Sequence, residues 1–120
     1  MKIALISDIH SNFDALESLM VEFNKEEIKE VLVAGDLIGY YYRPDKVIKT
    51  IMLDKRFHCI KGNHERMFEE ALKDNKKLEQ YRKKYGSSFD VCMDLLSQKQ
   101  INWLLSLPKT LNLSFGKNSF

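Results

Sequence analysis

Side chains that commonly bind metal ions follow three short apolar runs of the chain. Asp8 and His10 come after the first run, Asp36 after the second, and Asn63 and His64 after the third. In an α/β sheet, functional groups gather at the carboxyl ends of the strands, where the loops meet. The spacing therefore predicts one shared metal site. Its mixed oxygen and nitrogen donors suit manganese, iron, zinc or a similar first-row ion rather than a metal that prefers thiolates.

The three apolar runs are predicted to be strands because they are short and rich in β-forming residues. They cover residues 3–6, 31–34 and 57–60. The first run is almost continuously apolar, which is typical of a strand buried on both faces. Amphipathic helices are predicted between the runs, over residues 13–30 and 44–54. Strand, helix and strand in succession indicate parallel, right-handed βαβ units, and therefore an α/β sheet with helices on its faces.

The second half of the chain predicts mainly helices instead of alternating strands and helices. Residues 66–85 predict a strongly charged helix, and residues 89–96 and 98–107 predict two short helices. Apolar and polar residues then alternate over residues 110–115, which indicates a half-buried strand. The sequence Gly-Lys-Asn at 116–118 predicts a hairpin turn into a returning strand.

Composition and charge narrow the class of protein. The chain has 120 residues, 44% of them hydrophobic and 30% charged, which predicts one globular domain over residues 1–120. Its 19 basic and 17 acidic residues are too balanced to indicate a nucleic-acid or membrane partner. Cys59 and Cys92 lack metal-binding spacing and are expected to be buried and reduced. With no signal sequence or membrane-spanning run expected, the predicted location is cytoplasmic.

The order of the three motifs resembles the calcineurin-like metallophosphoesterase superfamily. The motifs are Asp-x-His at residues 8–10, Gly-Asp at 35–36 and Gly-Asn-His-Glu at 62–65. The resemblance is specific from Met1 to about Asn63. It implies half of a four-layer α/β/β/α sandwich. It also implies a metal-dependent phosphoesterase that hydrolyses phosphodiesters or phosphomonoesters with a metal-activated hydroxide.

The resemblance also implies roles for the individual residues. Asp36 would bridge two divalent ions, Asp8 and His10 would bind the first ion, and Asn63 would bind the second. Manganese is the first choice of metal, with iron, zinc or nickel as alternatives. His64 would not bind metal but would act as the catalytic residue beside the substrate. Glu65, the next residue, is a candidate for orienting His64.

One feature departs from this family pattern. The family continues to further histidine-bearing motifs that complete both metal sites, and residues 1–120 contain none of them. We therefore expect a domain truncated at its C-terminus, with weak binding of the second ion and reduced hydrolysis. The alternative hypothesis is a non-catalytic metal-binding or interaction module. Its open sheet edge would then pair with a second copy or with another chain that completes the fold.

Each candidate residue also has an ordinary structural explanation. Asp8 alone could cap a helix, His10 alone could be a surface histidine, and Asp36 alone could be a turn residue. These explanations must all hold at once, in the order of the family motifs and behind three predicted strands. The metal site is therefore the better hypothesis.

Three further features of the sequence have both a functional and a structural interpretation. His58 lies inside the third predicted strand and is expected to be structural. The consecutive residues Tyr40, Tyr41 and Tyr42 could stack on an aromatic leaving group or base, although tyrosines in such positions more often cover a loop. The lysine-rich region 73–84 is expected to be the solvated face of a helix.

Overall fold

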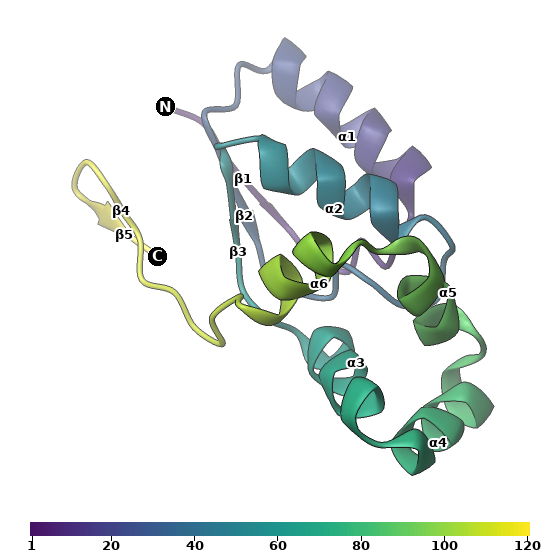
Figure 1. The fold of residues 1–120 in the computed structure, drawn as a ribbon. Helices are drawn as coiled ribbons and strands as arrows, with labels where there is room; N and C mark the ends of the chain where they lie inside the picture. Colours follow the sequence, from purple (N-terminus) through teal and green to yellow (C-terminus); the bar gives the residue numbers. More distant parts are fainter.

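A three-stranded parallel sheet positions the loops of interest. The computed structural model describes residues 1–120, and its strands are β1 (Ile3–Ile6), β2 (Glu30–Val33) and β3 (Phe57–Cys59). They lie side by side in the order β1-β2-β3 (Figure 1). The predicted α/β architecture is confirmed. The strands predicted over residues 3–6, 31–34 and 57–60 each lie within one residue of the observed strand.

Two helices connect the strands and lie on the same side of the sheet (Figure 1). They are α1 (Phe13–Lys25) and α2 (Pro44–Leu53). The side chain of Asn12 caps α1 by accepting a hydrogen bond from the N–H of Ala15 at 3.1 Å. The first helix ends five residues earlier than predicted, because the chain turns at Glu27, which has a φ of 54°. This turn leads the chain directly into β2.

Four helices follow the sheet. They are α3 (Asn63–Lys73), α4 (Asn75–Tyr85), α5 (Ser88–Leu95) and α6 (Gln98–Leu105). The single helix predicted over residues 66–85 is wrong, because Asp74 adopts an extended conformation between α3 and α4. The carboxylate of Asp74 accepts a hydrogen bond from the N–H of Lys76 at 2.9 Å and so begins the second helix. No residue of α4 is buried, as expected for a solvated, lysine-rich helix.

The hydrophobic core lies between the helices and one face of the sheet. Strand register places Ile6, Val33 and Cys59 in one row, and Val33 and Cys59 belong to the buried cluster. Leu16 of α1 and Ile48 of α2 are fully buried against it. Cys59 and Cys92 are both buried and unpaired, as predicted.

The other face of the sheet is open. The adjacent row of the register consists of Leu5, Leu32 and His58, and Leu5 is 74% exposed. The expectation that β1 is buried on both faces, with helices on both faces of the sheet, is therefore wrong. An uninterrupted apolar run shows that both faces are apolar, but it does not show that both are covered. A contact on this face supports the structural role expected of His58. Its Nε2 lies 2.6 Å from the Glu30 carboxylate.

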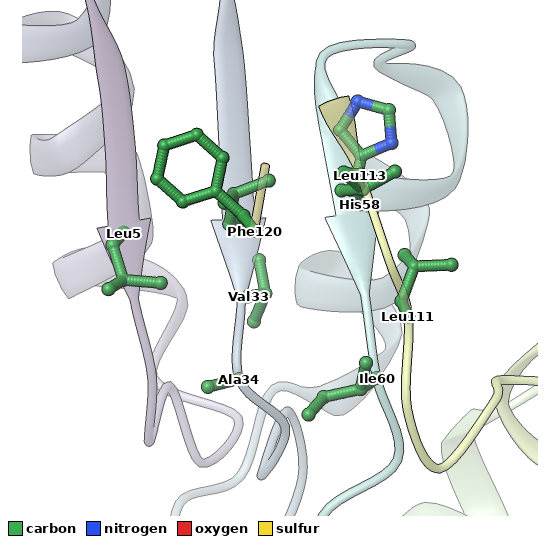
Figure 2. Close-up of a pocket in the computed structure, with 9 residues that line it drawn as sticks. Leu5, Val33, Ala34, His58, Ile60, Leu111, Leu113 and Phe120 are labelled. Carbon is green, nitrogen blue, oxygen red and sulfur yellow. The ribbon is translucent and has the colours of Figure 1, made fainter. Parts of the chain in front are cut away.

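The C-terminal segment forms one wall of an apolar trough on that open face. Its strands β4 (Ser114–Phe115) and β5 (Asn118–Ser119) form the predicted hairpin, separate from the main sheet. The strand predicted over residues 110–115 is wrong for its first four residues. Figure 2 shows the trough of about 340 Å³, with eight hydrophobic residues among its nine. They are Leu5, Leu32, Val33, Ala34, His58, Ile60, Leu111, Leu113 and Phe120.

No helix of the chain combines the length and the apolar character that crossing a bilayer requires.

Candidate metal centre

Three of the predicted metal ligands meet where β1 and β2 end. One donor atom from each of Asp8, His10 and Asp36 lies within 4.8 Å of the other two. The Asp8 side chain is 65% exposed, whereas that of His10 is 15% exposed. The cluster is therefore anchored by a largely buried imidazole and open to solvent on its carboxylate side.

The backbone at all three residues has an uncommon conformation. The φ angles of Asp8, His10 and Asp36 are 58°, 47° and 56°, in the left-handed region that few non-glycine residues adopt. Hydrogen bonds between the two loops hold this conformation. The N–H of His10 donates to the carbonyl of Asp36 at 3.0 Å, and that of Ser11 donates to the carbonyl of Leu37 at 2.8 Å. Such strain is concentrated at functional sites, where the surrounding structure enforces it.

The His10 ring is oriented as a metal ligand. Its Nδ1 lies 2.9 Å from the carbonyl oxygen of Ile38. A carbonyl only accepts hydrogen bonds, so Nδ1 carries a proton, and in the neutral ring this leaves the lone pair on Nε2. That Nε2 atom faces the Asp8 carboxylate at 3.3 Å. A backbone carbonyl that fixes the second nitrogen in this way is the usual support of a metal-binding histidine.

The donor set fits a divalent ion. Two ligands of one first-row ion lie at most about 4.2 Å apart, twice a bond of about 2.1 Å. The 4.8 Å limit of the observed group is only slightly larger. The exposed Asp8 side chain has the freedom to close the difference by rotation.

The third loop, after β3, packs directly against Asp36. A Cβ atom on Gly62 would lie 2.6 Å from Oδ1 of Asp36, so only glycine permits this approach. The backbone N–H of His64 donates to the same Oδ1 at 3.0 Å. Asn63 is the exposed first residue of α3, between these two contacts. The fold thus brings the start of α3, and Asn63 with it, to the metal group.

His64 lies beside the group but is enclosed. It is 6% exposed, and its ring centroid is 4.7 Å from that of His10. Burial lowers the pKa of His64, and the neighbouring His10 lowers it further, while Asp36 and Asp8 act in the opposite direction. Its Nδ1 is buried without a hydrogen-bond partner. The ring therefore has only Nε2 to offer to the site.

Glu65 does not have the role expected of it. Its fully buried carboxylate accepts hydrogen bonds from the backbone N–H groups of Asp36 at 2.7 Å, Leu37 at 3.1 Å and Gly62 at 3.0 Å. Glu65 therefore holds the loops after β2 and β3 together instead of orienting His64. Burial raises the pKa of Glu65, against the effect of these hydrogen bonds.

Tyr40 belongs to the site, although the sequence favours a role in covering a loop for all three consecutive tyrosines. Tyr40 has its ring centroid 4.9 Å from that of His10 and 4.9 Å from that of His64. Tyr85, at the end of α4, lies 5.4 Å from His64 on another side. The three consecutive tyrosines signalled an aromatic loop, but nothing in the sequence distinguished Tyr40 from its two neighbours or paired it with Tyr85.

Comparison with known proteins identifies two relatives of this chain. An uncharacterised protein of Methanocaldococcus jannaschii is 36% identical over 63 residues, which are 52% of this chain and 26% of that protein. A crystal structure of a metallophosphoesterase from Sphaerobacter thermophilus superimposes with a TM-score of 0.72 at 24% identity. The superposition covers 99% of this chain and 45% of that one, so the matched regions make up less than half of either protein. The structural likeness confirms the fold.

The family assignment rests on a match over nearly the whole chain. The model of the calcineurin-like phosphoesterase family matches residues 1–116, which include all three motifs and the loops that carry them. Members of this family use divalent metals, in agreement with the Asp-His-Asp group described above. The chain therefore belongs to the calcineurin-like phosphoesterase family.

Proposed function

We propose that this chain carries a metal centre that hydrolyses phosphate esters, either phosphodiesters or phosphomonoesters. The observation that supports this proposal most strongly is the meeting of Asp8, His10 and Asp36 around the free Nε2 of His10. The family match and the shared fold favour the same chemistry. The substrate is a phosphate ester whose charged oxygens approach the site from the exposed Asp8 side.

In this proposal the residues divide between two divalent ions, with manganese as the first choice. Asp8, His10 and Asp36 would hold the first ion, and Asp36 and Asn63 would contribute to the second. When bound, such ions supply a hydroxide nucleophile at neutral pH and offset the negative charge of the phosphate. The second ion would have fewer donors among the described residues and would therefore bind more weakly than the first.

His64 acts on the substrate from the edge of the centre. Because burial lowers its pKa, the imidazole is neutral at neutral pH. Its unpartnered Nδ1, packed against Gly39, favours the tautomer with the proton on Nε2. A proton at Nε2 can be donated in a hydrogen bond to a phosphate oxygen, which stabilises the negative charge on that oxygen.

Hydrolysis measured with defined metal content tests this function. The purified chain is incubated with Mn²⁺ and bis(p-nitrophenyl) phosphate or p-nitrophenyl phosphate, beside Asp36→Asn and the control His58→Ala. We expect metal-dependent release of p-nitrophenolate that Asp36→Asn lowers at least about 100-fold and His58→Ala leaves nearly unchanged. Turnover that is equal in all three proteins, or that survives chelation of the metal, would argue against the proposed site.

A second candidate function, self-association, is favoured by the open face of the sheet. The 74% exposed Leu5 and the apolar trough shown in Figure 2 leave hydrophobic side chains accessible on this face, and exposed apolar surface can mark an interaction site. The β4–β5 hairpin beside it has unpaired outer edges. We propose that a second copy of the chain covers this face.

The oligomeric state of matched variants tests this second candidate. Leu5→Lys places a charge on the open face, whereas Val21→Lys changes a residue of α1 that is also exposed. Sedimentation velocity at about 50 µM is expected to show a dimer for the unmodified chain and for Val21→Lys, but a monomer for Leu5→Lys. A monomeric unmodified chain at this concentration would exclude the proposal.

A further inference from the structure

Tyr40 combines features that a tyrosine covering a loop does not need. Its φ is 61°, in the left-handed region, where a bulky side chain is a true outlier. The backbone on either side is fixed, because the N–H of Tyr41 lies 3.2 Å from the carbonyl of His10 and 2.8 Å from that of Gly39. The fold thus maintains a strained conformation that directs this ring to the metal group.

The ring of Tyr40 packs against both the candidate metal ligand His10 and the candidate catalytic residue His64, whose own ring centroids are 4.7 Å apart. It meets His10 edge to face, with an interplanar angle of 83°, and meets His64 at 52°. Tyr85 stands 6.1 Å from Tyr40 and supports it from α4. Despite these contacts Tyr40 remains 48% exposed. The ring therefore has an accessible surface immediately beside the position of the substrate phosphate.

The two following tyrosines are placed differently. Tyr41 and Tyr42 line a separate shallow hollow with Asn12 and Phe13 at the start of α1. Neither ring has an aromatic contact with His10 or His64, although both are more exposed than Tyr40. Exposure alone therefore does not explain the position of Tyr40, and its neighbours serve as internal controls.

We propose that Tyr40 is a specificity-determining residue that stacks on an aromatic group attached to the substrate phosphate, as in an aryl or nucleoside ester. This inference rests on the proposed function of the metal centre. Stacking of an aromatic group on a protein ring strengthens binding by about tenfold or more. The metal group fixes the phosphate, and Tyr40 selects what the phosphate carries.

Binding of two phosphonates that differ only in the aromatic ring tests the proposal without requiring turnover. Phenylphosphonate and methylphosphonate are titrated calorimetrically into the full chain with Mn²⁺. We expect phenylphosphonate to bind about tenfold more tightly to the unmodified chain, to Tyr40→Phe and to Tyr42→Leu. Tyr40→Leu is expected to bind both ligands with the affinity of methylphosphonate.

The outcomes separate this inference from the function on which it rests. Equal binding of both phosphonates by the unmodified chain overturns the role of Tyr40 and leaves the phosphate site intact. An equal loss of both affinities in Tyr40→Leu also overturns it, because Tyr40 would then only support His10 and His64. Failure of the unmodified chain to bind either ligand in the presence of Mn²⁺ would count against both proposals.

Discussion

The ring of His64 occupies the space that a side chain on Gly39 would need. A Cβ atom on Gly39 would lie 2.3 Å from Nδ1 of His64 and 2.9 Å from its Cε1. Gly39 also has a φ of 96°, a backbone conformation that residues with a side chain rarely adopt. The position of the candidate catalytic ring therefore depends on a glycine in a different loop, 25 residues away in the sequence.

Gly39→Ala should be more destabilising than the same change at a glycine with open surroundings. Gly86 is the matched control, because its φ is 78° and no atom lies near its position. Both changes incur the left-handed penalty of about 1–2 kcal/mol, but only Gly39→Ala adds an overlap, which costs about 1–3 kcal/mol more. Urea unfolding measures the difference.

Removing the His64 ring should cancel the additional cost. In the Gly39→Ala/His64→Ala double variant, the free energy of unfolding should fall by less than the sum of the two single losses. Additive losses, or equal losses for Gly39→Ala and Gly86→Ala, would show that the glycine does not make room for this imidazole.

Glu65→Gln should destabilise the chain although the side chains have nearly the same shape. The carboxylate accepts hydrogen bonds from three backbone N–H groups, whereas an amide presents its own NH₂ group to some of them. Loss of charged, buried hydrogen bonds predicts a decrease in the free energy of unfolding on the order of 3 kcal/mol. Glu79→Gln, on the exposed surface of α4, should change it by less than about 0.5 kcal/mol. Similar unfolding midpoints for the two variants would refute the proposed role of Glu65.

The strands and the location of the site could be predicted because both depend on local sequence. Short apolar runs define β1, β2 and β3, and the carboxyl ends of parallel strands necessarily share one edge of the sheet. Asp8, His10 and Asp36 follow from that rule. The capping side chain of Asn12 and the initial proline of α2 are local signals as well.

The remaining features depend on contacts between distant segments. Glu65 has no local feature that predicts bonds to backbone groups of another loop. Tyr40 looks like Tyr41 and Tyr42 until the loops after β1 and β2 are placed together. The exposure of Leu5 depends on whether a second layer covers the sheet, which the apolar character of β1 cannot reveal.

The ion pair between Asp54 and Arg56 predicts a change of stability in acid. Hydrogen bonds from the Arg56 guanidinium, one of them 2.8 Å long, lower the pKa of Asp54. Because the pKa is lower in the folded chain than in the unfolded chain, this stabilisation is complete above the unfolded pKa of about 4 and is lost as the pH falls through the folded pKa. Asp54→Asn should therefore flatten the dependence of stability on pH in that range.

Urea unfolding at several pH values below about 5 measures this dependence. Asp94→Asn, at an exposed position of α5, is the control and should keep the slope of the unmodified chain. If the free energy of unfolding of Asp54→Asn depends on pH as steeply as that of the unmodified chain, the ion pair does not contribute to the loss of stability in acid.

The two thiols should be unreactive in the folded chain. Burial raises the pKa of Cys59 and of Cys92 to about 12. At pH 8 the thiolate fraction is then more than about a thousandfold below that of an exposed cysteine. Ellman's reagent should detect both thiols in urea but react with neither in the native chain faster than the chain unfolds. Immediate reaction of either thiol without urea would contradict the packing around it.

Binding of Mn²⁺ at equilibrium tests the central claim most directly. Electron paramagnetic resonance can count free Mn²⁺ in titrations of the unmodified chain, Asp36→Asn and His58→Ala. We expect one tighter ion per chain, with a weaker second ion, in the unmodified chain and in His58→Ala. We also expect at least about tenfold weaker binding of the first ion in Asp36→Asn. Equal affinity in all three proteins, or no binding to the folded unmodified chain, would show that Asp8, His10 and Asp36 do not form a metal centre.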